Sequence, residues 1–240
     1  MTTYPWTAHY EEGVPAVVAI PTTPLSQIVT DAAQKTPQKT AVHLLLKYLP
    51  LGLAVRAKMT YRQVDEASDR FAAGLQKLGV RKGDRVAIML PNLPQSVVAF
   101  FGILKAGAIV VNTNPIYTPR ELEHQLHDSG AETIILLSGF YERLQQIRQR
   151  TAIKHIIVTD ISDTLAWPFN KLTARQVRSS GLMKELPAAP ELHSYQELIR
   201  TTSVLTRVQT APDDVVLFQY TGGTTGVAKA AMLTNRNMVS

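Results

Sequence analysis

Four short apolar runs, separated by helix-like segments, constrain the fold of this chain more than any other feature. Three of the four runs are rich in valine and isoleucine, and none alternates cleanly between apolar and polar residues. That pattern indicates strands that are buried on both faces. The runs lie at residues 85–90 and 108–112, Thr133–Leu137 and His155–Thr159. The repeated strand–helix order predicts an α/β protein with a largely parallel sheet and flanking helices.

Two of the intervening segments begin with a capping box. Thr60 with Gln63, and Thr118 with Glu121, are spaced so that each side chain can bond the other residue's backbone N–H. The helix after Thr60 is expected to end at Gly79. Its predicted buried face comprises Tyr61, Val64, Ser68, Phe71, Leu75 and Leu78.

Other helix starts rest on single residues. Thr23 followed by Pro24 predicts a helix through Ile28, Val29 and Ala32, because proline is favoured at the first helical position. Asn92 is expected to cap a helix over residues 93–105, which is apolar on nearly all sides and should therefore be buried.

Composition and charge exclude several classes of protein. The chain has no cysteine, which excludes disulfide scaffolds, cysteine zinc sites and thiol nucleophiles. Lys plus Arg is 25 and Asp plus Glu is 19, a net charge of +6 without a block of like charges. This argues against nucleic acid as a partner and leaves a small anionic ligand open.

Residues 96–111 are apolar but are interrupted by Lys105 and Gly107, so we expect a buried helix and strand rather than a membrane span. The start of the sequence has no leader pattern, and we expect a cytoplasmic protein.

The pattern changes along the chain and suggests its division into parts. After residue 160 it becomes irregular, with expected helical pieces at residues 172–177 and 195–200, before the apolar run at residues 215–220. Thr234 is expected to cap a helix just as the sequence ends, which suggests a piece of a longer protein. The expected parts are an amino-terminal extension at 1–24, an α/β subdomain at 25–160, a linker at 161–210 and the start of a second subdomain at 211–240.

A glycine- and threonine-rich segment, FQYTGGTTGVAK at residues 218–229, is the main candidate for chemistry. Its glycines allow successive backbone N–H groups to face one concavity, its threonines add hydroxyls, and Lys229 adds a positive charge. These features suit a polyphosphate, although a plain hairpin loop would share the glycines. The candidate phosphate-binding residues are Thr221, Gly222, Gly223, Thr224, Thr225, Gly226 and Lys229.

This segment differs from two well-known phosphate loops. A Walker loop has glycine before its lysine and Ser or Thr after it, whereas Lys229 lies between Ala228 and Ala230. The dinucleotide pattern G-x-G-x-x-G is absent. Because β-rich residues flank the segment, we expect a tight loop between two strands, with Lys229 outside any helix.

Three ordered motifs resemble those of the adenylate-forming (acyl-CoA synthetase) superfamily. YTGGTTGVAK followed by AAMLTNRNM resembles its phosphate-loop signature. The stretches at residues 59–92 and 100–126, the latter containing LKAGAIVVNTNPIYTPREL, resemble two upstream blocks. The resemblance covers nearly the whole chain from about residue 25 and is strongest to bacterial long-chain-fatty-acid–CoA ligases.

The resemblance implies a two-step reaction with ATP, Mg²⁺ and coenzyme A. A fatty carboxylate would form an acyl-adenylate, and coenzyme A would then form the thioester. It implies that the loop holds the β- and γ-phosphates, that Thr221 contacts Mg²⁺ and that Lys229 is the loop lysine. The family's remaining catalytic residues lie downstream of Ser240, so residues 1–240 alone are expected to be inactive. An aryl- or short-chain-acid ligase and a non-catalytic homologue stay open, as do a homodimer and a peripheral contact with the inner face of the membrane.

Two positions depart from the family pattern. Ala230 stands where the family usually has glycine, and Asn235 stands where it usually has histidine. If the backbone at residue 230 were left-handed, alanine would force the loop exit to shift. Asn235 keeps a hydrogen-bonding group but loses a titratable ring.

Two weaker candidates are assigned structural roles. His124 and His127, with Glu121 nearby, have metal-ligand spacing on a helix, but both histidines are expected to face solvent, away from its buried residues. Residues 44–58 combine leucines with Lys47, and suit either a lipid-contacting segment or two strands joined by a turn. We favour the two strands.

Overall fold

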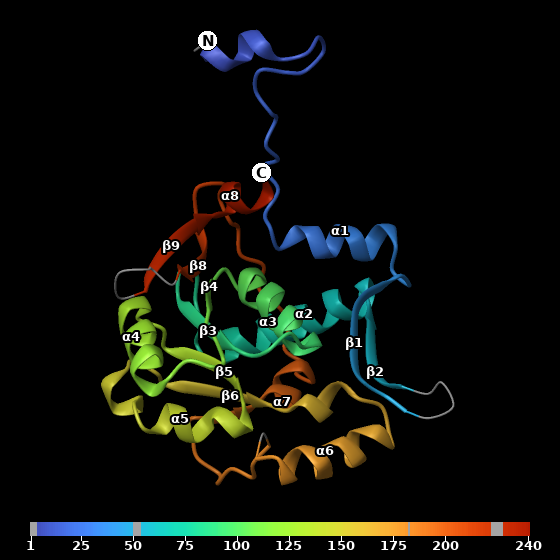
Figure 1. Cartoon of the computed structure of the whole chain (residues 1–240), viewed down its shortest axis with the longest axis vertical. Coiled ribbons are helices and arrows are strands. Elements are labelled where there is room, and N and C mark those ends of the chain that lie inside the picture. The colour runs from blue at the N-terminus through green and yellow to red at the C-terminus, as the bar shows by residue number, and fades with distance from the viewer. Residues whose placement is uncertain (1–3, 50–53, 182, 222–227) are drawn as a thin grey trace.

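The computed structural model describes residues 4–49, 54–181, 183–221 and 228–240. A seven-stranded sheet forms its centre, with the strand order β7-β6-β5-β3-β4-β8-β9. Figure 1 shows helices on both sides of this sheet and a separate two-stranded hairpin of β1 and β2. The strands are β1 (Thr40–Tyr48), β2 (Ala54–Thr60), β3 (Arg85–Met89), β4 (Ile109–Asn112), β5 (Thr133–Leu137), β6 (His155–Thr159), β7 (Leu192–Ser194), β8 (Val215–Thr221) and β9 (Lys229–Thr234).

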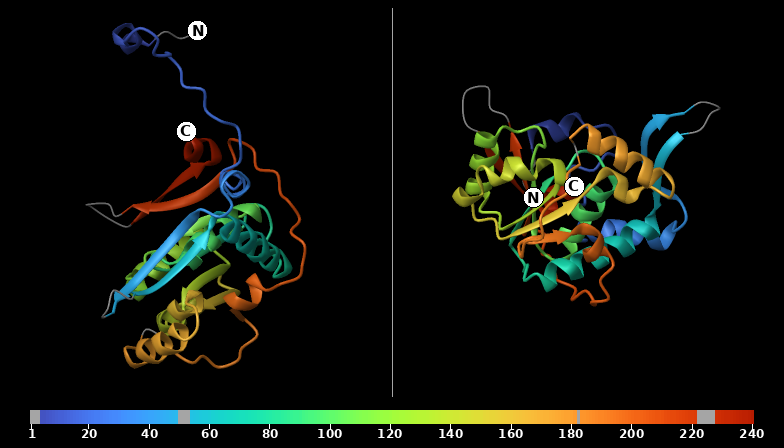
Figure 2. Two further views of the ribbon diagram at one scale, coloured as in Figure 1. Left: turned by 90° about the vertical axis from the view of Figure 1, so that its right-hand side faces the viewer. Right: turned by 90° about the horizontal axis from the view of Figure 1, so that it is seen from below.

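The helices connect these strands. The α-helices are α1 (Gln27–Lys35), α2 (Tyr61–Lys77), α3 (Pro94–Lys105), α4 (Pro119–Ser129), α5 (Tyr141–Gln145), α6 (Phe169–Ser179), α7 (Tyr195–Ile199) and α8 (Asn235–Val239). Short 3₁₀ turns are η1 (Pro5–His9), η3 (Ser138–Phe140), η4 (Arg148–Arg150) and η5 (Ile161–Thr164). Residues 4–20 extend away from the sheet and its helices (Figure 2).

The predicted parallel sheet is confirmed. β3 pairs in parallel with both β4 and β5, and β5 pairs in parallel with β6. Successive residues of a strand face opposite sides of the sheet, so neighbours such as Val86 and Ala87 are both fully buried but belong to different cores. The Val86 side packs against α2, α3 and α7, and the Ala87 side packs against α4 and α5. The absence of alternation in the sequence reflects this burial on both faces.

Both predicted capping boxes are present. Thr60 accepts from the Gln63 N–H at 3.3 Å while the Gln63 side chain accepts from the Thr60 N–H at 2.8 Å, and Thr118 and Glu121 make the same exchange. Gly79 follows α2 with φ of +93°, in the region where a side chain would be strained.

Two predicted helix starts are wrong by one to three residues. α3 begins at Pro94, and Ser96 Oγ accepts from the Leu93 N–H at 3.2 Å, so Asn92 lies one position too early to cap the helix. α1 begins at Gln27 rather than beside Thr23, because Pro24 starts a turn in which its carbonyl accepts from the Gln27 N–H at 2.8 Å.

The region after residue 160 contains more structure than the sequence suggested. The expected helical pieces are present as α6 and α7, but α6 is longer than predicted, and β7, only three residues long, was missed. β8 pairs in parallel with β4, and β9 pairs antiparallel with β8. The sheet thus continues across residue 211, where we expected a new subdomain to start. The domain division itself stays a prediction.

Residues 44–58 form the favoured strand pair. β1 and β2 are antiparallel, and their connecting residues 50–53 lie outside the described part of the chain. Val55 and Ala57 are buried against Leu165, so one face of the hairpin packs on the body of the protein.

Asn235 connects the end of the described chain to its beginning. Its side chain is fully buried; Oδ1 accepts from the Leu25 N–H at 2.6 Å and Nδ2 donates to the Thr23 carbonyl at 3.3 Å. Asn235, which departs from the family pattern, therefore lies next to the end of β9 that is farther from the glycine-rich segment. Its side chain makes structural contacts there.

We expect Asn235→Ala to lower the free energy of unfolding by about 1–3 kcal/mol, because the buried Leu25 N–H loses its acceptor. Urea denaturation would measure this. The matched control is Asn170→Ala, which removes an amide that accepts from the adjacent Lys171 N–H in α6, and it should change stability by less than about 0.5 kcal/mol. Equal losses in the two variants would contradict a special role for Asn235.

Candidate functional site

The β8–β9 hairpin brings Thr221 and Lys229 opposite each other. Thr221 is the last residue of β8, Lys229 is the first of β9, and the two are paired in the antiparallel ladder. Both are exposed. The prediction that strands flank the glycine-rich segment is confirmed, and a Walker-type arrangement with Lys229 in a first helical turn is excluded. The predicted phosphate-binding residues Gly222, Gly223, Thr224, Thr225 and Gly226 lie outside the described residues.

Ala230 fits its position without strain. It lies inside β9 and pairs with Tyr220, so its backbone is extended rather than left-handed. The shift of the loop exit that alanine would have forced is therefore not needed.

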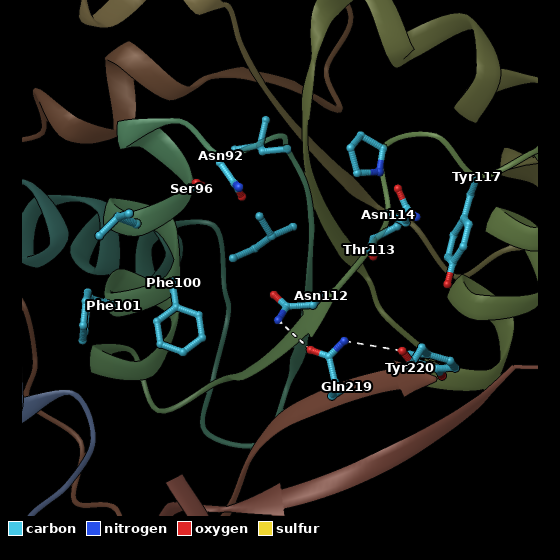
Figure 3. Close-up of a pocket in the computed structure, with 14 residues that line it drawn as sticks. Asn92, Ser96, Phe100, Phe101, Asn112, Thr113, Asn114, Tyr117, Gln219 and Tyr220 are labelled. Carbon is cyan, nitrogen blue, oxygen red and sulfur yellow. Dashed lines mark hydrogen bonds between the residues drawn. The ribbon is translucent and has the colours of Figure 1, made fainter. Parts of the chain in front are cut away.

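A cavity of about 800 Å³ opens beside this hairpin (Figure 3). It lies at the carboxyl ends of β3, β4 and β8, the edge where open α/β sheets usually bind ligands. Aromatic rings and side-chain amides dominate its lining, and none of the lining residues that the structure describes is Asp, Glu, Lys, Arg or His. They are Ile88, Leu90, Asn92, Ser96, Val97, Phe100, Phe101, Asn112, Thr113, Asn114, Pro115, Tyr117, Gln219 and Tyr220.

Two amide side chains connect the strand ends at the cavity. Asn112 Nδ2, at the end of β4, donates to Gln219 Oε1 of β8 at 3.0 Å, and Gln219 Nε2 donates to the Tyr220 carbonyl at 3.4 Å (Figure 3). Sequence reasoning missed Asn112 and Gln219. The available signal was their position at the ends of buried apolar runs, where polar side chains of neighbouring parallel strands meet.

Tyr220 joins the cavity to helix α4. Its hydroxyl donates to Asp128 Oδ2 at 2.6 Å. Burial, and then the hydrogen bond to Asp128, raises the pKa of Tyr220 above its ordinary value, so the hydroxyl stays protonated at neutral pH. Among the described residues, the lining therefore offers uncharged donors and acceptors for binding and orientation, but no carboxylate, imidazole or amine for proton transfer.

The weaker metal candidates do not converge. Glu121 caps α4 through Thr118, His127 is exposed, and His124 Nε2 lies 2.9 Å from the Ala228 carbonyl. The expectation that His124 faces solvent is wrong, because β9 begins against that face of α4. In the described ranges, no group of three His, Asp or Glu side chains could hold a metal ion.

The model of one protein family matches residues 29–240, which is most of the chain and includes the hairpin and the cavity. Its description is AMP-binding enzyme. The chain belongs to the AMP-binding enzyme family. The predicted resemblance to adenylate-forming enzymes is thereby confirmed.

Curated members of the AMP-binding family support this placement. A long-chain-fatty-acid–CoA ligase of Escherichia coli O157:H7 is 47% identical over 185 residues, covering 76% of this chain and 33% of that protein. A ligase of the same name from Bacillus subtilis is 35% identical over 239 residues, covering 98% of this chain and 41% of that protein. The chain thus spans about a third of the length of the first of these relatives.

Solved structures of AMP-binding enzymes share the fold. A long-chain-fatty-acid–CoA ligase from Archaeoglobus fulgidus superposes with a TM-score of 0.68 at 26% identity, covering 94% of this chain and 39% of that one. An anthranilate–CoA ligase in complex with anthranoyl-AMP superposes with a TM-score of 0.69 at 25% identity, covering 91% and 36%. Within the described part of the chain, no helix is both long and apolar enough to cross a bilayer.

Proposed function

We propose that this chain supplies the amino-terminal, phosphate-binding part of an ATP-dependent long-chain-fatty-acid–CoA ligase. The observation that carries the proposal is the β8–β9 hairpin, which pairs Thr221 with Lys229 at the two ends of the TGGTTGVAK segment. Ligases named for long-chain fatty acids are its relatives at 35–47% identity, which favours that substrate class.

In the first step, a carboxylate oxygen of the fatty acid attacks the α-phosphorus of ATP and the bond to pyrophosphate breaks. In the second, the sulfur of coenzyme A attacks the acyl carbonyl, the bond to AMP breaks and the thiol proton is released. Lys229 would neutralise charge on the departing pyrophosphate, because it is the exposed first residue of β9 and pairs with Thr221 across the hairpin.

The donor set near Thr221 is compatible with Mg²⁺. The exposed Thr221 hydroxyl offers one hard oxygen, and Mg²⁺ in nucleotide sites takes few protein ligands beside phosphates and water. Bound there, Mg²⁺ would neutralise phosphate charge. The uncharged cavity suits an apolar or aromatic part of a ligand rather than its phosphates. A cytoplasmic location, a peripheral membrane contact and a homodimer stay predictions.

Pyrophosphate release by the full-length protein tests the substrate class. With ATP and Mg²⁺ present, we expect palmitate to support release at least about 10-fold faster than 4-coumarate or acetate, a difference of about 1.4 kcal/mol in transition-state binding. A preference for 4-coumarate or acetate would instead support the alternative of an aryl- or short-chain-acid ligase.

A further inference from the structure

Helix α4 contacts both sides of the β8–β9 connection. Asp128 Oδ2 accepts the hydroxyl proton of Tyr220, the residue directly before Thr221, at 2.6 Å. His124 Nε2 donates to the carbonyl of Ala228, the residue directly before Lys229, at 2.9 Å. His124 and Asp128 are four residues apart, so they lie one turn apart on the same face of α4.

The helix that carries these two side chains is itself firmly held. Its own Leu122 and Leu126 are fully buried in the core on this side of the sheet. Gln125 Nε2 donates to the Asn112 carbonyl at 2.7 Å. α4 is therefore a fixed support, and it contacts the ends of β4, β8 and β9 through three neighbouring side chains.

We propose that His124 and Asp128 are positioning residues that fix Thr221 and Lys229 relative to each other for binding the phosphates of ATP. The proposal rests on the function proposed above. Charge stabilisation by hydroxyl and ammonium groups is effective only when the groups are held in place before the substrate arrives. Tyr220 and Ala228 each precede one of those groups by a single residue, so holding them limits the movement of both.

Paired substitutions in the full-length protein separate positioning from general stability. We expect Asp128→Ala and His124→Ala each to reduce kcat/KM for ATP in acyl-adenylate formation by about 10-fold. This is the effect expected when one well-made hydrogen bond is lost. Asp128→Asn keeps an acceptor for Tyr220 and His124→Gln keeps a donor for Ala228, so both should stay within about 3-fold of the unsubstituted protein. Thioester formation from supplied acyl-adenylate should change less than about 2-fold in all four, since pyrophosphate has left by then.

Glu123→Gln provides the matched control on the same helix. It weakens the ion pair with Arg150 on another side of α4 and should leave acyl-adenylate formation unchanged. The proposal would be overturned if the alanine variants lost rate equally in both half-reactions, or if Glu123→Gln lost as much rate as they do. It would also be overturned if Asp128→Asn and His124→Gln did not restore the rate.

Amide hydrogen exchange of residues 229–234 gives a readout that does not depend on the reaction. Exchange there should accelerate in Asp128→Ala and His124→Ala but not in Glu123→Gln. If it does so while the unsubstituted protein releases no pyrophosphate with any acid, the anchoring by α4 holds and the proposed function is wrong. If exchange is unchanged in both alanine variants, the anchoring itself is wrong.

Discussion

Lys229→Ala should slow acyl-adenylate formation by about 10- to 1,000-fold in the full-length protein while changing thioester formation far less. Lys229 is exposed at the first position of β9, directly across from Thr221, so its ammonium is free to reach a polyphosphate. Pyrophosphate leaves before the thiol attacks, and the charge that Lys229 would balance is then gone.

The two half-reactions must be measured separately for this prediction. Palmitate-dependent pyrophosphate release reports the first, and conversion of supplied palmitoyl-adenylate with coenzyme A reports the second. Lys154→Ala is the matched control, because Lys154 is an exposed lysine that directly precedes β6, pairs with Glu132 and lies away from the hairpin. Equal slowing of both half-reactions by Lys229→Ala would contradict a role confined to the phosphates.

The largest loss of stability is expected from Lys105→Ala. The side chain of Lys105 is 3% exposed, and Nζ lies 2.6 Å from Oδ1 of both Asp65 and Asp69 and 3.0 Å from the Asp65 carbonyl. This cluster joins α3 to α2. Removing the ammonium leaves two carboxylates facing each other without a counter-charge, so unfolding free energy should fall by about 3 kcal/mol. Both aspartates retain some contact with solvent, so the loss should lie at the lower end of the range for buried pairs.

Two further variants sharpen this test in urea denaturation. Lys154→Ala, which breaks an exposed pair with Glu132, should cost less than about 1 kcal/mol. Adding Asp69→Asn to Lys105→Ala should recover part of the loss, because it removes one unpaired carboxylate. A loss from Lys105→Ala no greater than that of the exposed control would show that the cluster contributes little.

The sequence predicted those features that depend on neighbouring residues. The strands β3 to β6 could be located because burial on both faces leaves runs without polar residues, and α2 and α4 because their capping boxes are local patterns. The strands flanking the glycine-rich segment were predicted from the β-rich residues on each side of it. β7 was missed because three residues are too few to show a period.

Contacts between distant segments could not be predicted in this way. Asn112 and Gln219 are 107 residues apart in the chain, and nothing local to β4 indicates that β8 will lie beside it. The contact between His124 and Ala228 spans 104 residues, and the spacing on α4 alone placed this histidine in solvent. The candidate residues could thus be recognised from their residue types, whereas the distant residues that contact them could be identified only from the fold.

Chemical labelling of Lys229 tests the central claim, that this end of the hairpin contacts the polyphosphate of ATP. The rate of acetylation at Lys229 should fall in the presence of ATP with Mg²⁺ or of pyrophosphate, and should fall little with AMP, which lacks the β- and γ-phosphates. The exposed lysines Lys58 and Lys154 should react at the same rate in every case. A Lys229 rate that ATP and pyrophosphate leave unchanged, or that AMP lowers equally, would contradict the account.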